Sequence, residues 1–151
     1  MPGVRVRVVG DDGQPLGPGE AGEVCVQGVS VMDGYWKQPE MTSETLVDGW
    51  LRTGDIGVWS DDGYLTLVDR KKDMVVSGGF NVFPREIEDV LTSHSAVSVA
   101  AVIGVPDDKW GEAVTALVVL RPGASATADE LIALVKERKG AIYAPKTIEF
   151  L

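Results

Sequence analysis

The sequence has very little of the two residue types that most often hold metal ions. Its 151 residues include one cysteine, Cys25, and one histidine, His94. A single cysteine excludes an internal disulfide and any site built from several thiolates. A single histidine argues against a histidine-rich metal site and against a His-based charge relay. We therefore expect no metal ligands in this chain, and the lone cysteine fits a reducing, cytoplasmic setting.

Long apolar runs are also lacking, and basic residues are few in the first half. No uninterrupted apolar stretch approaches the roughly 18 residues that a membrane-spanning helix needs. Residues 1–69 contain 4 Lys and Arg against 12 Asp and Glu, a balance of −8, whereas residues 70–151 contain 10 against 11, a balance of −1. Nucleic acid is not an expected partner, because binding it needs a net basic surface. The balance changes at Arg70, which marks a candidate domain boundary.

What remains is the composition of a globular protein with many turns. Hydrophobic residues make up 44% of the chain and charged residues 25%, which is enough to bury a core. The 18 glycines and 8 prolines exceed what a helical bundle needs. Period-two alternation and turn residues predict a strand-rich first half. Its expected elements are strands at 4–9, 23–28 and 74–77, a hairpin of 50–59 with 64–69, and a short helix at 39–46 with Thr42 or Ser43 near its start.

The second half alternates helices with apolar strands. Residues 84–94 combine a first-turn proline with apolar residues at helical spacing. Thr127 and Glu130 have the spacing of a capping box that opens another helix. The expected elements are helices at 84–94 and 127–139 and strands at 96–105, 112–120 and 146–151, with 96–105 apolar enough to be buried on both faces.

This order of elements predicts an α+β fold with two modules. A β-rich subdomain is expected at residues 1–70. A small α+β domain, with a central sheet flanked by helices, is expected at residues 71–151.

The segment RTGDIG, residues 52–57, contains the first candidate binding residue. Gly54 permits a tight backbone turn, and Asp55 follows at the bend. A carboxylate held in this way can accept two hydrogen bonds, which suits a vicinal diol such as a ribose. An aspartate that only closes an Asx-turn is the alternative, and local chemistry alone favours it.

A second candidate is the loop Ser77-Gly78-Gly79. Glycine-rich loops bind phosphate when they open a helix, because free backbone N–H groups then point at the anion. Here four residues separate Gly79 from Pro84, and the chain contains no GxxxxGK[ST] or GxGxxG motif. The sequence therefore favours a loop that moves, or that another group approaches closely, over a phosphate cradle.

Charged and aromatic residues leave further alternatives open. The cluster DRKKD at 69–73 is either a solvated hairpin end or a hinge, since it lies where the composition changes. Trp110, in an acidic loop, is either a core plug or a stacking platform. Glu23, Glu86 and Glu88 are formal candidates for acid–base chemistry. The preference of helix first turns for acids explains Glu86 and Glu88.

Taken together, these segments resemble the adenylate-forming enzymes, a superfamily that includes acyl-CoA synthetases, firefly luciferase and the adenylation domains of peptide synthetases. The resemblance is carried, in order, by GEVCVQGVSVMDGYW (22–36), WLRTGDIG (50–57), VDRKKDMVVSGGFNVFPREIEDVL (68–91), VAAVIGVPDDKWGEAVTALVVL (99–120) and YAPKTIEF (143–150). It covers essentially the whole chain. DRKKDM followed by GFNVFPREIEDV is most similar to bacterial fatty-acyl-CoA ligases.

The resemblance implies a reaction and its cofactors. Such enzymes use ATP with Mg²⁺ to convert a carboxylic acid into an acyl-adenylate and pyrophosphate. A smaller C-terminal domain then rotates about a hinge, and CoA attacks to give the thioester and AMP. By this resemblance residues 1–70 are the end of the large N-terminal AMP-binding domain, a distorted barrel, and residues 71–151 are the mobile C-terminal domain.

The resemblance also implies roles for single residues. Asp55 would hold the ribose hydroxyls of the adenylate, and Arg70 the same ribose or the neighbouring phosphate. Lys72 falls at the hinge. The passage for the pantetheine arm of CoA would be lined by Ser77, Gly78, Gly79 and Trp110.

Segments that relatives carry are missing. The phosphate loop and the adenine-binding segment lie upstream in relatives, and the adenylating lysine lies shortly beyond the position of Leu151. We therefore expect a C-terminal fragment that is inactive alone, lacks its N-terminal domain and self-associates through a former interface. The alternatives are part of an aryl- or amino-acid-activating ligase, whose acid pocket also lies upstream, and a non-catalytic interaction module.

Overall fold

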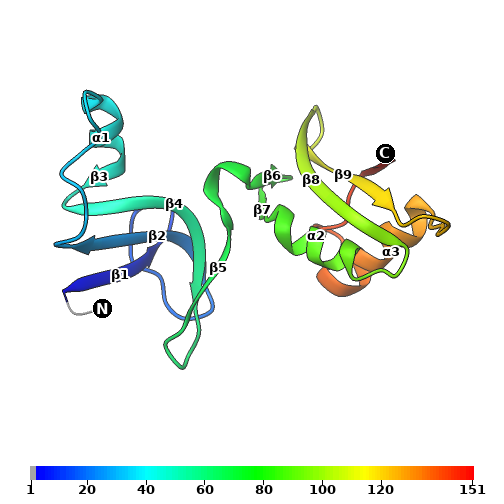
Figure 1. The fold of residues 1–151 in the computed structure, drawn as a ribbon, viewed down its shortest axis with the longest axis horizontal. Helices are drawn as coiled ribbons and strands as arrows, with labels where there is room; N and C mark the ends of the chain where they lie inside the picture. The colour runs from blue at the N-terminus through cyan, green and yellow to red at the C-terminus, as the bar shows by residue number, and fades with distance from the viewer. Residues whose placement is uncertain (1–2) are drawn as a thin grey trace. The chain divides into compact units, whose positions relative to one another are not determined.

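The computed structural model describes residues 3–151, which divide into two compact units between Lys72 and Asp73 (Figure 1). The expected 1–70 subdomain begins with residues 1 and 2, which lie outside the described part. The division falls two residues after the position where the charge balance changes. The α+β class expected from the sequence is confirmed, since each unit contains a strand-rich sheet and few helices.

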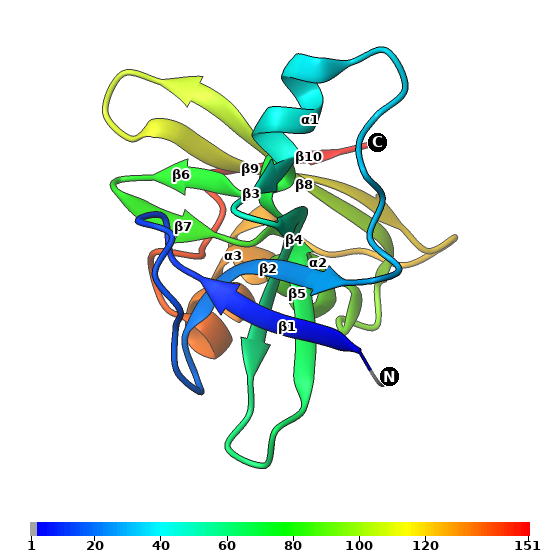
Figure 2. The ribbon, with the colours of Figure 1, turned by 90° about the vertical axis from the view of Figure 1, so that its left-hand side faces the viewer.

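The first unit is built on an antiparallel sheet. Its strands are β1 (Val4–Val9), β2 (Ala21–Gly28), β3 (Leu46–Val47), β4 (Trp50–Trp59) and β5 (Leu65–Arg70). The order is β1-β2-β4-β3, and β5 also pairs with β4 (Figure 2). Consecutive residues at the end of β1 and in the first half of β2 are buried, so both faces of the sheet are covered here; the buried apolar side chains are Val8, Val9, Val24 and Cys25, with Ile56 of β4.

One prediction for this unit was wrong in detail. Helix α1 (Pro39–Thr45) begins three residues before Thr42, with proline in its first turn. Thr42 and Ser43 therefore lie inside the helix. The Thr42 hydroxyl donates to the carbonyl of Gln38, at 2.8 Å, and accepts the amide of Tyr35, at 2.9 Å. Thr42 thus fastens the preceding loop to the helix.

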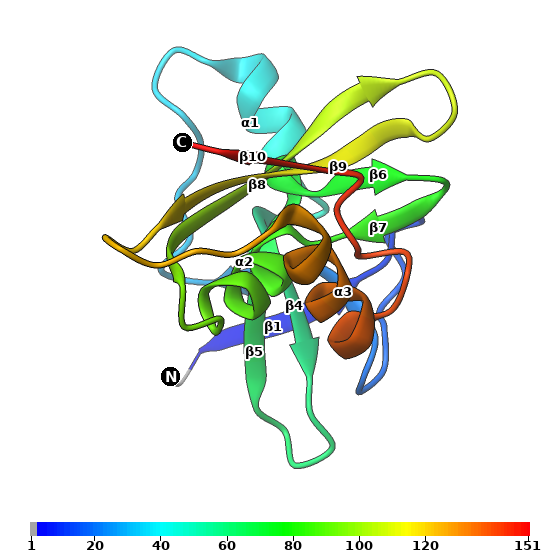
Figure 3. The same cartoon turned by 90° about the vertical axis from the view of Figure 1, so that its right-hand side faces the viewer.

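The second unit packs two helices on one sheet. Its elements are the strands β6 (Val75–Ser77), β7 (Phe80–Val82), β8 (Val97–Asp107), β9 (Gly111–Leu120) and β10 (Thr147–Phe150), and the helices α2 (Pro84–Thr92) and α3 (Ala128–Lys139). β8 is antiparallel and β10 parallel to β9. Both helices lie over the same sheet and contact each other (Figure 3). Ile87, Leu91, Leu131 and Val135 fill the space between, each fully buried.

The strand predicted at 96–105 is present, but its predicted burial on both faces was wrong. Val97 and Val102 are buried against the helices, whereas Val99, Ile103 and Val105 are 56%, 46% and 38% exposed. An apolar run does not by itself distinguish a strand covered on two faces from one covered on a single face.

The capping box predicted for α3 is present, and it makes the helix sensitive to acid. Thr127 Oγ1 accepts the amide of Glu130, and the Glu130 carboxylate accepts the amide of Thr127 at 2.8 Å. The Thr127 hydroxyl also donates to the Glu130 carboxylate, at 3.0 Å. The hydrogen bonds that this carboxylate accepts from the Thr127 amide and hydroxyl lower the pKa of Glu130 below its usual 4.5.

A carboxyl group whose pKa is lower in the folded than in the unfolded state stabilises the fold at pH values above its unfolded-state pKa. This stabilisation is lost as the pH falls through the folded-state pKa. We expect Glu130→Gln to be less stable than the parent near neutral pH and the difference to shrink below about pH 4.5. Thermal unfolding between pH 3 and 7 measures this. Glu137→Gln, which removes a charge from the same helix outside the box, is the control. A stability difference that does not change with pH would contradict the prediction.

Candidate functional site

A bulge in β4 sets the position of Asp55. Glu23 of β2 pairs with Ile56, whereas Cys25, two residues on, pairs with Arg52, so the intervening residues of β4 leave the regular ladder. Gly54 has φ +74°, a conformation that favours glycine. Thr53 closes the bulge: its hydroxyl donates to the Val24 carbonyl at 2.9 Å and accepts the Asp55 amide at 3.1 Å. Asp55 is thus held by the strand and not merely by a local turn.

Arg70 lies directly opposite Asp55 on β5. The two residues are register partners, and Arg70 Nε donates to Asp55 Oδ1 at 3.3 Å. The two side chains are 60% and 32% exposed, respectively. The pair therefore presents a fixed carboxylate with remaining acceptor capacity beside a guanidinium whose side chain is largely exposed. Such an arrangement can hold a hydroxylated, negatively charged ligand.

A buried carboxylate fixes the chain just after Arg70. Glu23 is 6% exposed and accepts Lys71 Nζ at 3.0 Å, while Arg52 Nε lies 3.4 Å away. Both cations contact Glu23 Oε2, and this ion-pair network accounts for the burial of Glu23 without acid–base chemistry. Lys72, the predicted hinge residue, follows in the short 3₁₀ helix η1 (Lys71–Asp73) and is exposed.

The Ser77-Gly78-Gly79 loop is a tight hairpin turn. The strand that follows it, β7, was not predicted from the sequence. β6 and β7 pair antiparallel, with Ser77 opposite Phe80. Gly78 and Gly79 have φ +59° and +83°, as a type I′ turn requires. The Gly78 amide donates to the Trp110 carbonyl at 2.8 Å, so it is already engaged. This geometry also argues against the phosphate cradle, because the turn leads into a strand and not into a helix.

Trp110 forms the wall of a pocket beside this turn and is only partly buried. A Cβ on Gly78 would lie 3.0 Å from the indole ring, so the loop is approached closely, as one of the two sequence interpretations expected. Lys109 and Lys146 hold their ammonium groups over the ring, 4.9 and 4.6 Å from its centre. The pocket has a volume of about 220 Å³ and is lined by Ser77, Phe80, Trp110, Ala141, Ile142 and Lys146.

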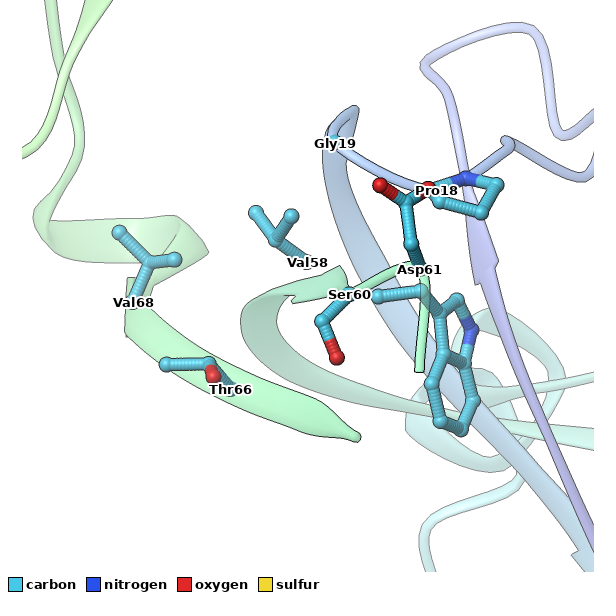
Figure 4. Close-up of a pocket in the computed structure, with 8 residues that line it drawn as sticks. Pro18, Gly19, Val58, Ser60, Asp61, Thr66 and Val68 are labelled. Atoms are coloured by element: carbon cyan, nitrogen blue, oxygen red, sulfur yellow. The ribbon is translucent and has the colours of Figure 1, made fainter. Parts of the chain in front are cut away.

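A second hollow lies in the first unit and was not foreseen. It has a volume of about 350 Å³ beside the turn between β4 and β5, and its lining includes Val58, Thr66 and Val68 (Figure 4). Val68 is an extra residue of β5 relative to β4, since Ile56 pairs with Asp69 and Gly57 with Leu67. This hollow therefore arises at a bulge. Only one charged side chain, Asp61, is among its lining residues.

The two helix glutamates have structural partners. Glu86 forms an ion pair with Lys139 at 2.7 Å, which joins α2 to α3. Glu88 Oε1 accepts the amide of Val102 at 2.9 Å, a backbone group of β8. Only Glu86 lies in the first turn of α2, so the first-turn explanation expected for Glu88 was wrong, and for Glu86 it is only part of the explanation. Long-range contacts with α3 and β8 account for the rest.

Two family models match the chain. Residues 1–36 match the AMP-binding enzyme model, and residues 86–151 match the model of the AMP-binding enzyme C-terminal domain. The chain belongs to the AMP-binding, adenylate-forming enzyme family.

Relatives of this family match nearly the whole chain. It is 51% identical to a medium/long-chain fatty-acid–CoA ligase, FadD8, of Mycobacterium tuberculosis, over 95% of this chain and 26% of that protein. It is 47% identical to a feruloyl-CoA synthase of Amycolatopsis, over 96% of this chain and 30% of that protein. The solved structure of the amide bond synthetase McbA from Marinactinospora thermotolerans matches with a TM-score of 0.92 at 45% identity, over 99% of this chain and 31% of that one.

The chain therefore spans between a quarter and a third of the length of these relatives. The recognition made from the sequence is confirmed at the level of the AMP-binding family. Within residues 3–151, no helix is both long and apolar enough to cross a membrane.

Proposed function

We propose that this chain is the C-terminal part of an ATP-dependent acyl-CoA synthetase, a fatty acid–CoA ligase. Such an enzyme activates a carboxylic acid as its acyl-adenylate and transfers the acyl group to CoA. The observation that carries the proposal is the Asp55–Arg70 pair, a fixed and partly exposed carboxylate beside a guanidinium. The fatty acid is favoured as substrate because the FadD8 ligase is 51% identical over 95% of this chain.

In this proposal Asp55 accepts hydrogen bonds from the ribose hydroxyls of the adenylate. A carboxylate is suited to this because its two oxygens can each accept a hydroxyl proton. Arg70 Nε donates to one carboxylate oxygen and orients the carboxylate, and the other guanidinium N–H groups bind the same ribose or the neighbouring phosphate. Residues 1–70 are the end of the AMP-binding domain in this assignment.

Lys72 is the proposed pivot, and the part of the expected 71–151 domain that follows it is the proposed mobile domain. The compact units divide between Lys72 and Asp73. Lys71 is tied to the buried Glu23, so the chain before the pivot is fixed. Lys72 itself is exposed, and the short helix η1 that contains it has no buried residue. These are the properties of a hinge, in which a few residues between rigid parts absorb the change in φ and ψ.

The pocket beside Trp110 is the proposed passage for CoA. Its walls are mainly apolar, from Phe80, Ala141 and Ile142, which suits the pantetheine arm. The ammonium groups of Lys109 and Lys146 over the indole ring supply positive charge for an anionic ligand such as CoA. Ser77, Gly78 and Gly79 form the turn at the edge of this pocket. The glycines keep the turn free of side chains, which allows close approach.

ATP would enter such an enzyme with Mg²⁺. Among residues 3–151, no group of three or more His, Cys, Asp or Glu side chains is placed to hold a metal ion. Residues 3–151 therefore do not form a Mg²⁺ site by themselves.

Nucleotide binding tests the role of Asp55. We expect the chain to bind AMP weakly and Asp55→Asn to reduce the affinity at least tenfold, because two charge-assisted hydrogen bonds are lost. Isothermal titration with AMP and with 2′,3′-dideoxy-AMP measures the effect. The dideoxy analogue should bind both forms with equal, low affinity. Asp33→Asn makes the same change at an exposed position and is the control. Equal AMP affinity in Asp55→Asn and Asp33→Asn would refute the ribose assignment.

A ligase that activates an aryl or amino acid is the second candidate. The observation in its favour is the similarity of the feruloyl-CoA synthase and of McbA, 47% and 45% identical to this chain. The experiment that separates the two candidates uses the protein extended to the full length of its relatives. It compares the rate of acyl-CoA formation from fatty acids with the rate from aromatic acids. Two expectations from the sequence remain predictions: the 151-residue chain is inactive alone, and it self-associates. A non-catalytic binding role remains the alternative.

A further inference from the structure

The hairpin of β6 and β7 is too short to hold its own shape. Each strand has three residues, and isolated hairpins are at best marginally stable. Its inner side chains, Val75 and Val82, are buried in the core of the second unit. The exposed turn therefore depends on what the hairpin contacts beyond its own ladder.

The backbone attaches β6 to β9 only at the end near the turn. Ser77 pairs with Gly111, and the Gly78 amide donates to the Trp110 carbonyl. Val76 has no main-chain partner on β9 in the ladder. Its amide instead donates to Glu112 Oε2 at 2.7 Å. The Glu112 carboxylate thus accepts the hydrogen bond that a backbone carbonyl of β9 would otherwise accept. It extends the contact between β6 and β9 by one residue.

Space for this carboxylate is left by Gly104 of β8. A Cβ at Gly104 would lie 3.0 Å from Glu112 Cδ and Oε1. Gly104 faces Val114 in the β8–β9 ladder, and its missing side chain leaves room for Glu112 beside Val75. The glutamate therefore occupies a defined position and does not swing freely in solvent.

We propose that Glu112 is a positioning residue for the CoA pocket. Its carboxylate holds Val76, and through Val76 it fixes the turn of Gly78 and Gly79 against Trp110. This inference rests on the proposed function, in which the turn and Trp110 line the passage for CoA. Glu112 itself does not line the pocket.

Amide hydrogen exchange and CoA titration test the inference together. In the 151-residue chain, Glu112→Ala should speed exchange of the Val76 amide about tenfold or more, because a charge-assisted hydrogen bond is lost. CoA affinity should fall about tenfold. Glu112→Gln keeps an oxygen that accepts the Val76 amide, so both quantities should stay within about threefold of the parent. Exchange in α3 should not change in either variant, since Val76 is exposed and solvent can replace the lost partner.

Glu149→Ala is the matched control, because it removes an exposed glutamate from β10 of the same sheet. Unchanged Val76 exchange in Glu112→Ala, or a failure of Glu112→Gln to restore it, would overturn the inference. Faster exchange throughout the second unit would show a general structural role and would also overturn it. If the parent chain binds no CoA, the pocket assignment of the proposed function fails. Val76 exchange alone then decides whether Glu112 holds the turn.

Discussion

Leu131→Ala is expected to lower the free energy of unfolding of the second unit by about 3 kcal/mol. Leu131 is fully buried on α3, in the core cluster between the helices and the sheet. The cost combines the lost transfer free energy of the side chain with the cavity that remains when the surroundings relax only in part. For a small unit this is a large share of its total stability. Amide exchange of β9 under native conditions measures the change.

Leu134→Ala is the matched control for this prediction, because it makes the same substitution on the same helix. Leu134 is only partly buried against the cluster, so less apolar surface is lost and water can fill the space. We expect less than half the effect of Leu131→Ala. Amide exchange of β2 in the first unit should be unchanged in both variants. Equal effects of the two substitutions would show that α3 does not pack as described.

Gly22→Ala is expected to destabilise the first unit by about 3 kcal/mol, at the upper end of the usual cost of overpacking. Gly22 lies in β2, and a Cβ there would overlap the carbonyl of Val9 and lie 2.6 Å from Leu16 Cδ1. The carbonyl cannot move away easily, because β1 is fixed in the ladder next to β2. The two strands must separate to admit the methyl group. Denaturation followed by amide exchange of β1 and β2 measures the loss.

Gly17→Ala provides the comparison for Gly22. Gly17 precedes β2 in a loop, and its nearest potential neighbour is Glu20 Oε2 at 3.4 Å, an ordinary contact with a movable side chain. We expect a change within about 0.5 kcal/mol, as for most surface substitutions. A similarly small change in Gly22→Ala would mean that β1 and β2 separate at little cost, contrary to the register observed.

Regular elements were predictable because their signals are local. Alternation located β1 and β2, and proline followed by apolar residues at helical spacing located α2. The capping box fixed the start of α3. Strand β7 was missed because its three residues are too few to show a period. The Gly-Gly pair before it is a hairpin signal that could have identified it.

The geometry of the site depends on pairings that no local pattern contains. The bulge that positions Asp55 exists only relative to β2, whose register shifts between Glu23 and Cys25. Lys71 reaches Glu23 across 48 residues of sequence, and Val76 reaches Glu112 across 36. Resemblance to a family could propose Asp55, Arg70 and Trp110. It did not indicate which side chains hold them in place.

The ion pair between Glu23 and Lys71 has a consequence for how such proteins can be recombined. It ends the first unit with a side-chain anchor one residue before Lys72, and the next residue, Asp73, already belongs to the second unit. The peptide bond after Lys72 is therefore a natural splice point. Exchange of everything beyond it for the corresponding segment of a relative leaves each unit with its own complete core, so such hybrids are expected to keep the stability of both parents.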